Sequence, residues 1–486
     1  MKPGNPIRIA AGMLALAAWS GVAQQAIAQA ESAQGKPAAD AKPRILHLSA
    51  KPAPVPALRY RLFPVEPELT PGDAAPIYIR LNCEMPDGAM NEMRQKADWL
   101  TLPEDQFPLA DARNYVNRWK LRLEQMAFGA QRQSCNWNYT LPEQKEHSVD
   151  ILLPDAQGAR TWAYLAALKV RVETAEHRYD DAIRSLETGL SYGRHAGQGP
   201  FLVNNLVGIA IVNLMLDRIE ELVARPDAPN LYWALAALPS PFVSVREAME
   251  NEQKLVEWMI PGLADVESPR TEAEWAAVLV RIHARIIALM KSAGDVSIPS
   301  TAFDPKYENL ARFKDELLPL AKAYLSQRRG EAVAGKMPAE QLIVLYISGL
   351  HHDLWDDAFK ATYLPFADAL PLHRVASERI KASSTGALAF LGVFVAHSAA
   401  PVHSSQARLD RRIATLRVVE ALRMHAADHG NQLPESLGQV TSVPIPLDPV
   451  TGKPFEYQRD GDAATLQGPQ GNPHTPALRY TITLRK

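Results

Sequence analysis

Apolar residues recur at helical spacing along most of this chain. Over residues 112–128, 159–175 and 179–190 they fall three or four positions apart, which places them on one face of an α-helix. The same pattern predicts further helices at residues 201–223, 245–259, 272–291, 311–327, 339–350 and 353–363. The hydrophobic pattern therefore predicts a mainly α-helical protein.

Two of these helices form a predicted helical hairpin, joined at Glu176–Arg178. Ala182 occupies a small position in the second helix, as in a tetratricopeptide unit, which predicts a solenoid-like body. The next helix, residues 201–223, is apolar nearly all round but contains several asparagines and Asp217. We interpret it as a buried central helix and predict no membrane span beyond the leader.

The last hundred residues change to a different pattern. Residues 409–427 predict an amphipathic helix that ends at His429-Gly430. Residues 455–459 and 463–466 predict two strands around the turn at Asp460, and residues 478–484 alternate apolar and polar as a third strand. The predicted tail, residues 401–486, is a small α+β unit with one helix and about three antiparallel strands.

The first thirty residues have the layout of a secretory signal peptide. Lys2 and Arg8 precede an apolar run over residues 9–23, and small residues follow up to Ala30. This predicts export to the periplasm or beyond, with a cleaved leader or an uncleaved leader that anchors the chain. Residues 31–57 are rich in Ala, Lys and Pro and predict a disordered linker, followed by a helical body over residues 58–400.

Composition narrows the function classes. Lys and Arg number 52 against 54 Asp and Glu, a net charge of -2, so a nucleic-acid partner is not expected. The two cysteines, Cys83 and Cys135, form one disulfide or remain free thiols in an oxidising compartment. No cofactor motif is present in the sequence, and none is expected.

Residues 351–357 hold the densest set of candidate metal ligands: His351, His352, Asp353, Asp356 and Asp357. His352 and Asp356 are one helical turn apart, so both can face one ion. A metal site would need a further ligand from elsewhere in the chain. The alternative interpretation is a solvated helix start, where carboxylates favour the positive end of the helix dipole.

Three further patterns have both a functional and a purely structural interpretation. Residues 189–193 fit the GxSxG pattern of a nucleophile elbow, which requires a strand directly before the serine. Ser191 instead lies in or at the end of a predicted helix, so a helix terminus with accidental glycines is the favoured interpretation. His195 follows in a predicted loop, where it lines a pocket or ends a helix beside glycines. The C-terminal aspartates, Asp448, Asp460 and Asp462, suit calcium or ordinary turns, and turns are favoured.

Several segments resemble an uncharacterised family of exported, mostly helical bacterial proteins: Cys135-Asn136-Trp137, GPFLVNNLVGIAI, APNLYWALAALP and the stretch from RRIATLRVVEALRMHAADHG to PFEY. The C-terminal part is also similar to the globular domain of type II secretion pseudopilins. The matching positions are Gly430, Pro434, Asp448, Pro449, Gly452, Pro454 and Tyr457. This second resemblance implies a fold for the tail, a helix leading into a small sheet.

The sequence leaves three functions open. The favoured one is an exported, non-catalytic helical scaffold or protein-binding protein of the bacterial cell envelope, with a protein or peptide partner on a helical surface. The alternatives are a metal-dependent hydrolase that uses the cluster at residues 351–357, and a secretion-related structural component of the envelope. Enzymatic activity is therefore not assigned.

Overall fold

The computed structural model describes residues 43–86, 88–137, 154–294, 304–391, 399–470 and 478–485. The chain is mainly helical with a small C-terminal sheet, which confirms the predicted fold class. The predicted signal peptide lies outside the described residues. The described chain divides into two compact units, which we call the helical unit (246–403) and the α+β unit (43–245 and 404–485, with the gaps above).

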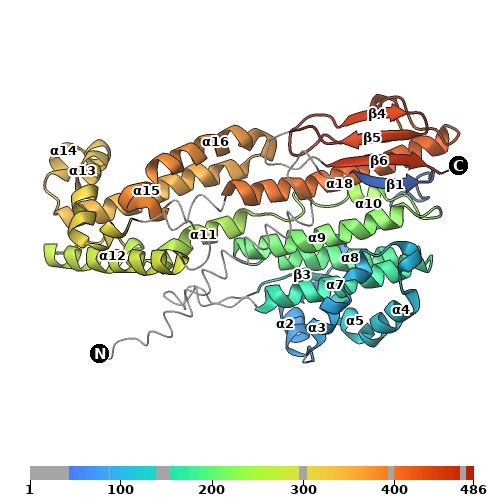
Figure 1. Ribbon diagram of the computed structural model, residues 1–486, viewed down its shortest axis with the longest axis horizontal. Helices are drawn as coiled ribbons and strands as arrows, with labels where there is room; N and C mark the ends of the chain where they lie inside the picture. Colours follow the sequence, from blue (N-terminus) through green and yellow to red (C-terminus); the bar gives the residue numbers. More distant parts are fainter. Residues whose placement is uncertain are drawn as a thin grey trace. The chain divides into compact units, whose positions relative to one another are not determined.

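The α+β unit begins with a strand and a set of short helices. In chain order these are β1 (Arg44–Leu48), β2 (Thr70–Asp73), α2 (Ala75–Cys83), α3 (Ala89–Gln95), α4 (Leu109–Arg118), α5 (Lys120–Ala130) and β3 (Arg132–Ser134). Three long helices and one short helix follow: α7 (Pro154–Ala175), α8 (Tyr179–Ala196), α9 (Leu202–Val223) and α10 (Tyr232–Ala236). The helices α7, α8 and α9 pack side by side (Figure 1).

The helix α9 packs against both α7 and α8. Nearly all its large apolar side chains are buried, as expected for a helix that is apolar on every side. Among the described helices it alone is long and apolar enough to cross a membrane, and 78% of its most apolar window is buried inside the structure. Its burial fits the interpretation as a central core helix.

The C-terminal sheet has four strands in the order β1-β6-β5-β4. As predicted, β4 (Glu456–Asp460), β5 (Ala463–Gln467) and β6 (Arg479–Leu484) are antiparallel neighbours. The prediction of a disordered linker over residues 31–57 is wrong at β1, which pairs in parallel with β6. The reason is the alternation in RILHL, which buries Leu46 and Leu48 and leaves Ile45 and His47 exposed.

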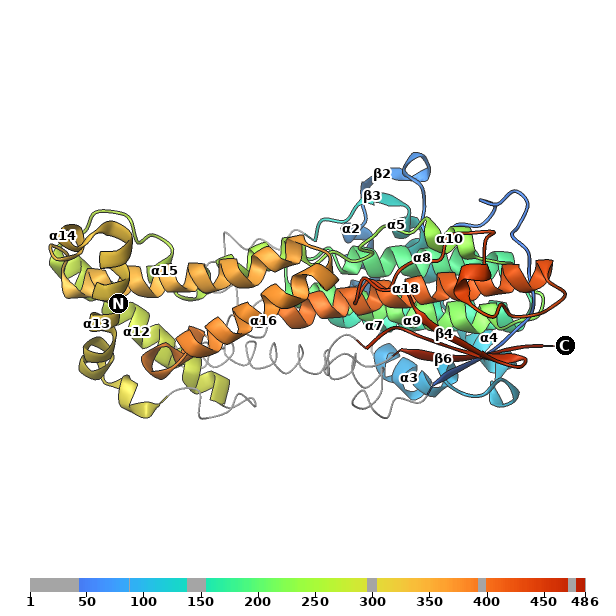
Figure 2. The ribbon, with the colours of Figure 1, turned by 90° about the horizontal axis from the view of Figure 1, so that it is seen from above.

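The described residues of the helical unit form the α-helices α11 (Arg246–Met259), α12 (Glu272–Gly294), α13 (Leu310–Arg329), α14 (Glu331–Ala334), α15 (Ala339–Phe359) and α16 (Phe366–Ser383). The helix α15 packs against α12, α13 and α16 (Figure 2). The predicted break between residues 350 and 353 is absent, because α15 runs through it without interruption.

The observed division differs from the predicted boundary at residues 400 and 401. The helix α18 (Ala399–Asp428) gives its first residues to the helical unit and the rest to the α+β unit. The C-terminal tail belongs with the N-terminal helices because α18 carries charged side chains that bond to the earlier chain. Arg412 contacts Asp217 on α9, and Arg423 donates to the carbonyl oxygen of Ala228 at 2.9 Å.

Candidate functional site

The predicted metal ligands, residues 351–357, lie in the C-terminal half of α15, so the interpretation as a helix start is wrong. His352 Nε2 is 2.8 Å from Glu257 Oε1 on α11, and this hydrogen bond raises the pKa of His352. Asp356 is exposed to solvent. Within the described residues, no three His, Cys, Asp or Glu side chains are placed to hold one metal ion. His352 and Asp356 therefore have no third ligand in this part of the chain.

The other carboxylates of the cluster are bound by cations on neighbouring helices. Asp353 accepts from Tyr324 Oη at 2.9 Å and from Arg328 Nη2 at 2.6 Å. Asp357 is paired with Arg379 and Lys360. Burial alone would raise the pKa of Asp357, but the Lys360 hydrogen bond and the Arg379 charge outweigh it and lower the pKa. These contacts tie α15 to α13 and α16.

The GxSxG pattern lies inside α8, as predicted, without a strand before Ser191. Its glycines serve helix packing. A Cβ atom on Gly189 would lie 2.3 Å from Met215 Sδ, and one on Gly193 would lie 2.8 Å from Val212 Cγ2, both on α9. The pattern therefore marks the close contact between α8 and α9 and does not form a nucleophile elbow.

His195 is buried in the last turn of α8, with Gly197 as the C-cap, which confirms the interpretation as a histidine that ends a helix beside glycines and not its placement in a loop. Its Nδ1 atom is 2.9 Å from the Tyr78 hydroxyl, and Trp137 donates to its carbonyl oxygen at 2.9 Å. Burial lowers the pKa of His195 to about 4. A neutral imidazole in this aromatic surrounding holds α2, α8 and the segment after β3 together.

Both cysteines are free thiols in the described structure, so it contains no disulfide between them. Cys83 is exposed at the last residue of α2, whereas Cys135 is buried just after β3. Burial raises the pKa of the Cys135 thiol, which keeps it protonated and poorly nucleophilic.

Of the three C-terminal aspartates considered for calcium, Asp448 is bound by protein groups. Asp448 is fully buried, and Arg411 donates to it from Nε at 2.7 Å and from Nη2 at 2.6 Å. Thr451 Oγ1 donates to the same carboxylate at 2.6 Å, and Gly452 follows in the left-handed region at φ +67°. Asp448 is therefore a turn former that is fixed to α18, as the turn interpretation expects.

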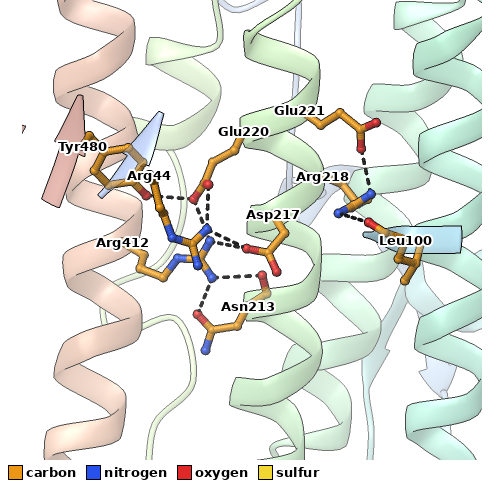
Figure 3. Close-up of polar contacts among 9 residues, drawn as sticks. All are labelled: Arg44, Leu100, Asn213, Asp217, Arg218, Glu220, Glu221, Arg412 and Tyr480. Atoms are coloured by element: carbon orange, nitrogen blue, oxygen red, sulfur yellow. Dashed lines mark hydrogen bonds and ion pairs between the residues drawn. The ribbon is translucent and has the colours of Figure 1, made fainter. Parts of the chain in front are cut away.

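The most extensive polar constellation in the α+β unit was not predicted from the sequence. We call it the α9–α18 charge cluster, and Figure 3 shows its members: Arg44, Asn213, Asp217, Glu220, Arg412 and Tyr480. They come from β1, α9, α18 and β6. The sequence does carry a signal for it, since residues 213, 217 and 220 are polar positions three and four apart on a largely apolar helix.

Arg412 occupies the centre of the cluster. Its Nη2 atom donates to Asp217 Oδ1 and to Glu220 Oε1, both at 2.7 Å, while Nη1 donates to Asn213 Oδ1 at 2.9 Å. Burial alone would lower the pKa of this guanidinium, but the two carboxylates outweigh it and raise the pKa. The side chain therefore stays charged although it is buried.

Two further groups complete the cluster. Arg44 Nη1 donates to Asp217 Oδ1 at 2.9 Å and to Glu220 Oε2 at 2.7 Å, and Tyr480 donates to Glu220 Oε1 at 2.8 Å. Burial would raise the pKa of Asp217, but Arg412 and Arg44 lower it overall. Two guanidinium groups thus face two carboxylates, and the cluster fastens β1, β6 and α18 to α9.

On another side of α9, Arg218 makes a separate connection (Figure 3). Its Nη2 atom donates to the carbonyl oxygen of Leu100 at 3.0 Å, and Nη1 donates to Glu221 Oε2 at 2.7 Å. The arrangement of these charges is suited to positioning helices and strands. Comparisons with protein-family models, with curated proteins and with solved structures gave no match to this chain.

Proposed function

We propose that this protein is an exported, non-catalytic helical scaffold of the bacterial cell envelope that binds a protein partner. The observation that carries the proposal is on α5, where Leu121 is 65% exposed and Phe128 is 51% exposed. The two side chains are seven residues apart, so they lie on one face of the helix. Large apolar side chains exposed together on one helix face are typical of protein-binding surfaces.

Charges of both signs surround this α5 face. The Arg132 guanidinium lies over the Phe128 ring at 4.1 Å from its centroid. Glu124 lies between Leu121 and Phe128 on the same face, with its Oε1 atom 3.9 Å from Lys120 Nζ. We therefore propose a protein segment with apolar side chains as the partner.

The test uses the mature chain and the exported fraction of its own host. We expect a partner to be captured by the wild type and lost with Leu121→Ser/Phe128→Ser, because these changes remove the apolar face. The control is Asn114→Ser/Asn117→Ser, two exposed changes on the neighbouring helix α4. Recovery of the same proteins by the wild type and the α5 variant would contradict the proposal, as would repeated recovery of none.

The export part of the proposal is supported by the signal-like first thirty residues. Since β1 starts at Arg44, about a dozen residues separate the predicted leader from the fold. Fractionation of cells that express the full chain tests this part, and retention in the cytoplasm would contradict it. The metal-dependent hydrolase is not proposed, because His352 is bonded to Glu257 and has no three-ligand site within the described residues.

A further inference from the structure

Two histidines lie one helical turn apart at the carboxyl end of α18. His425 is in the last turn of the helix, and His429 directly follows its last residue, Asp428. Their rings are stacked, with 3.8 Å between the ring centroids and an angle of 8° between the ring planes. His429 is exposed, whereas His425 is 7% exposed. The pair of imidazoles therefore reaches solvent on the side of His429.

The hydrogen bond of His429 fixes which of its ring nitrogens carries the proton. Its Nδ1 atom is 2.8 Å from the carbonyl oxygen of His425. A carbonyl oxygen only accepts a hydrogen bond, so Nδ1 is the protonated nitrogen and Nε2 of the neutral ring keeps a free lone pair. Histidines that bind metal ions are commonly held in this way, with the second ring nitrogen donating to a backbone carbonyl.

The His425 ring is also free to bind an ion. Within the described part of the chain its ring nitrogens have no hydrogen-bond partner, and neither nitrogen is fully enclosed. Burial and the neighbouring His429 lower the pKa of His425, so its ring is neutral near pH 7, the form that coordinates metal ions. By contrast, His373 and His403 use ring nitrogens to bond to each other at 3.0 Å.

The spacing of the two stacked rings suits two ligands of one ion. Bonds of about 2.0–2.1 Å at a tetrahedral Zn²⁺ place two ligand nitrogens roughly 3.3 Å apart. The ring centroids are 3.8 Å apart, and a tilt of the unbonded His425 ring brings both lone pairs to one point. We propose that His425 and His429 together bind one divalent transition-metal ion of the kind that imidazole prefers, Zn²⁺ or Cu²⁺, with water as the remaining ligands.

Two protein ligands make this a weak and exchangeable site. Within the described residues no group of three His, Cys, Asp or Glu side chains is placed to hold an ion, so water completes the coordination. The exposed Asp428 interacts electrostatically with His425 and adds a negative charge beside the ion. We expect a dissociation constant on the order of micromolar. The site does not rest on the proposed protein partner, because neither histidine lies on α5.

The first experiment is a calorimetric titration of the mature chain with Zn²⁺ at pH 7. We expect one saturable site that His429→Gln weakens by about tenfold or more, because the helix no longer holds a second imidazole beside the first. Glutamine can still donate to the carbonyl oxygen of residue 425, which preserves the end of the helix.

The matched control for the titration is His47→Gln, which changes another exposed histidine whose ring bonds to Thr483. This variant should bind Zn²⁺ as the wild type does. The absence of saturable binding in the wild type would overturn the inference, and so would equal affinity in the wild type and His429→Gln.

The second experiment identifies the ligands with Cu²⁺ as the probe. Electron paramagnetic resonance of the chain with one equivalent of Cu²⁺ counts the coordinated nitrogens through their splitting of the copper signal. We expect two imidazole nitrogens in the wild type and in His47→Gln, and one in His429→Gln and in His425→Gln. A spectrum that is the same in the wild type and in both of the last two variants would overturn the shared site even where Zn²⁺ binds.

Discussion

At the scale of single residues, the α9–α18 charge cluster buries charged side chains inside the α+β unit. Arg412 is 5% exposed, and its partners Asp217 and Glu220 lie on the largely apolar helix α9. Burying such an ion pair costs desolvation free energy, and the attraction between the two charges offsets this cost only while both partners are present. The cluster therefore provides orientation for β1 and α18 more than net stability.

We predict that Arg412→Met destabilises the protein by about 3–5 kcal/mol, because it leaves two buried carboxylates with Arg44 as their remaining cation. Urea unfolding of the mature chain measures this. The matched control is Arg184→Met, which removes an exposed ion pair with Asp181 and should change the free energy of unfolding by less than about 1 kcal/mol. Equal effects of the two substitutions would contradict the assignment.

At the scale of elements, close helix contact depends on glycine. A Cβ atom on Gly208 of α9 would lie 2.6 Å from the carbonyl oxygen of Gly193 and 2.7 Å from the amide nitrogen of Gly197. Both are backbone atoms, so no side-chain rotation can relieve the overlap. The segment from Gly189 to Gly197 is thus the surface on which α9 rests.

We predict that Gly208→Ala destabilises the protein by about 1–3 kcal/mol, because α8 and α9 must move apart. Alanine by itself favours a helix over glycine by about 1 kcal/mol, so any net loss measures the packing. Thermal unfolding checks this against Gly438→Ala, where the nearest atom to a new Cβ is 3.8 Å away. A Gly208→Ala protein as stable as the wild type would show that the helices are not in such close contact.

Helices and strands with a regular apolar pattern of their own could be predicted from the sequence. Elements that form only with a partner far away in the chain could not. The helix at residues 201–223 and the three C-terminal strands follow from local pattern alone. The strand β1 is five residues long and pairs with residues of β6 that lie 436 positions later in the chain, Arg44 with Tyr480 for example. The break predicted within α15 is absent, and Asp353 and Asp357, which lie in the continuous helix, pair with cations on α13, on α16 and in the turn after α15.

The candidate site shows the same limit. The sequence drew attention to dense local runs such as residues 351–357, whereas the charge cluster is assembled from residues 44, 213–220, 412 and 480. A charged residue on a largely apolar helix indicates that it has a partner of opposite charge, but not which residue that partner is. The sequence therefore singles out Asp217 as unusual, but it does not identify Arg412 as its partner.

At the scale of the whole molecule, four buried histidines make the fold sensitive to acid. Burial lowers the pKa of His195, His351, His373 and His403 to about 4. The last two share a 3.0 Å hydrogen bond between Nε2 of His373 and Nδ1 of His403. Since the folded pKa lies below the unfolded value of about 6.5, unfolding takes up protons.

We predict that the free energy of unfolding has its full value above pH 6.5 and decreases as the pH falls from 6.5 towards 4. At pH 5 each of these histidines would cost about 2 kcal/mol. Chemical denaturation at pH 7 and pH 5 measures the loss, and His351→Phe should reduce it by about that amount. An identical loss in the wild type and the variant would contradict the assignment of His351 as a buried neutral group.

The strand β1 has a consequence for the order in which the chain can fold. It follows the predicted leader, yet its partner β6 is the last of the described strands. The pairing of β1 with β6 therefore cannot form until residues 479–484 are present. Under the proposed export with the amino terminus first, the pairing of β1 with β6 would form only after residues 479–484 have crossed the membrane.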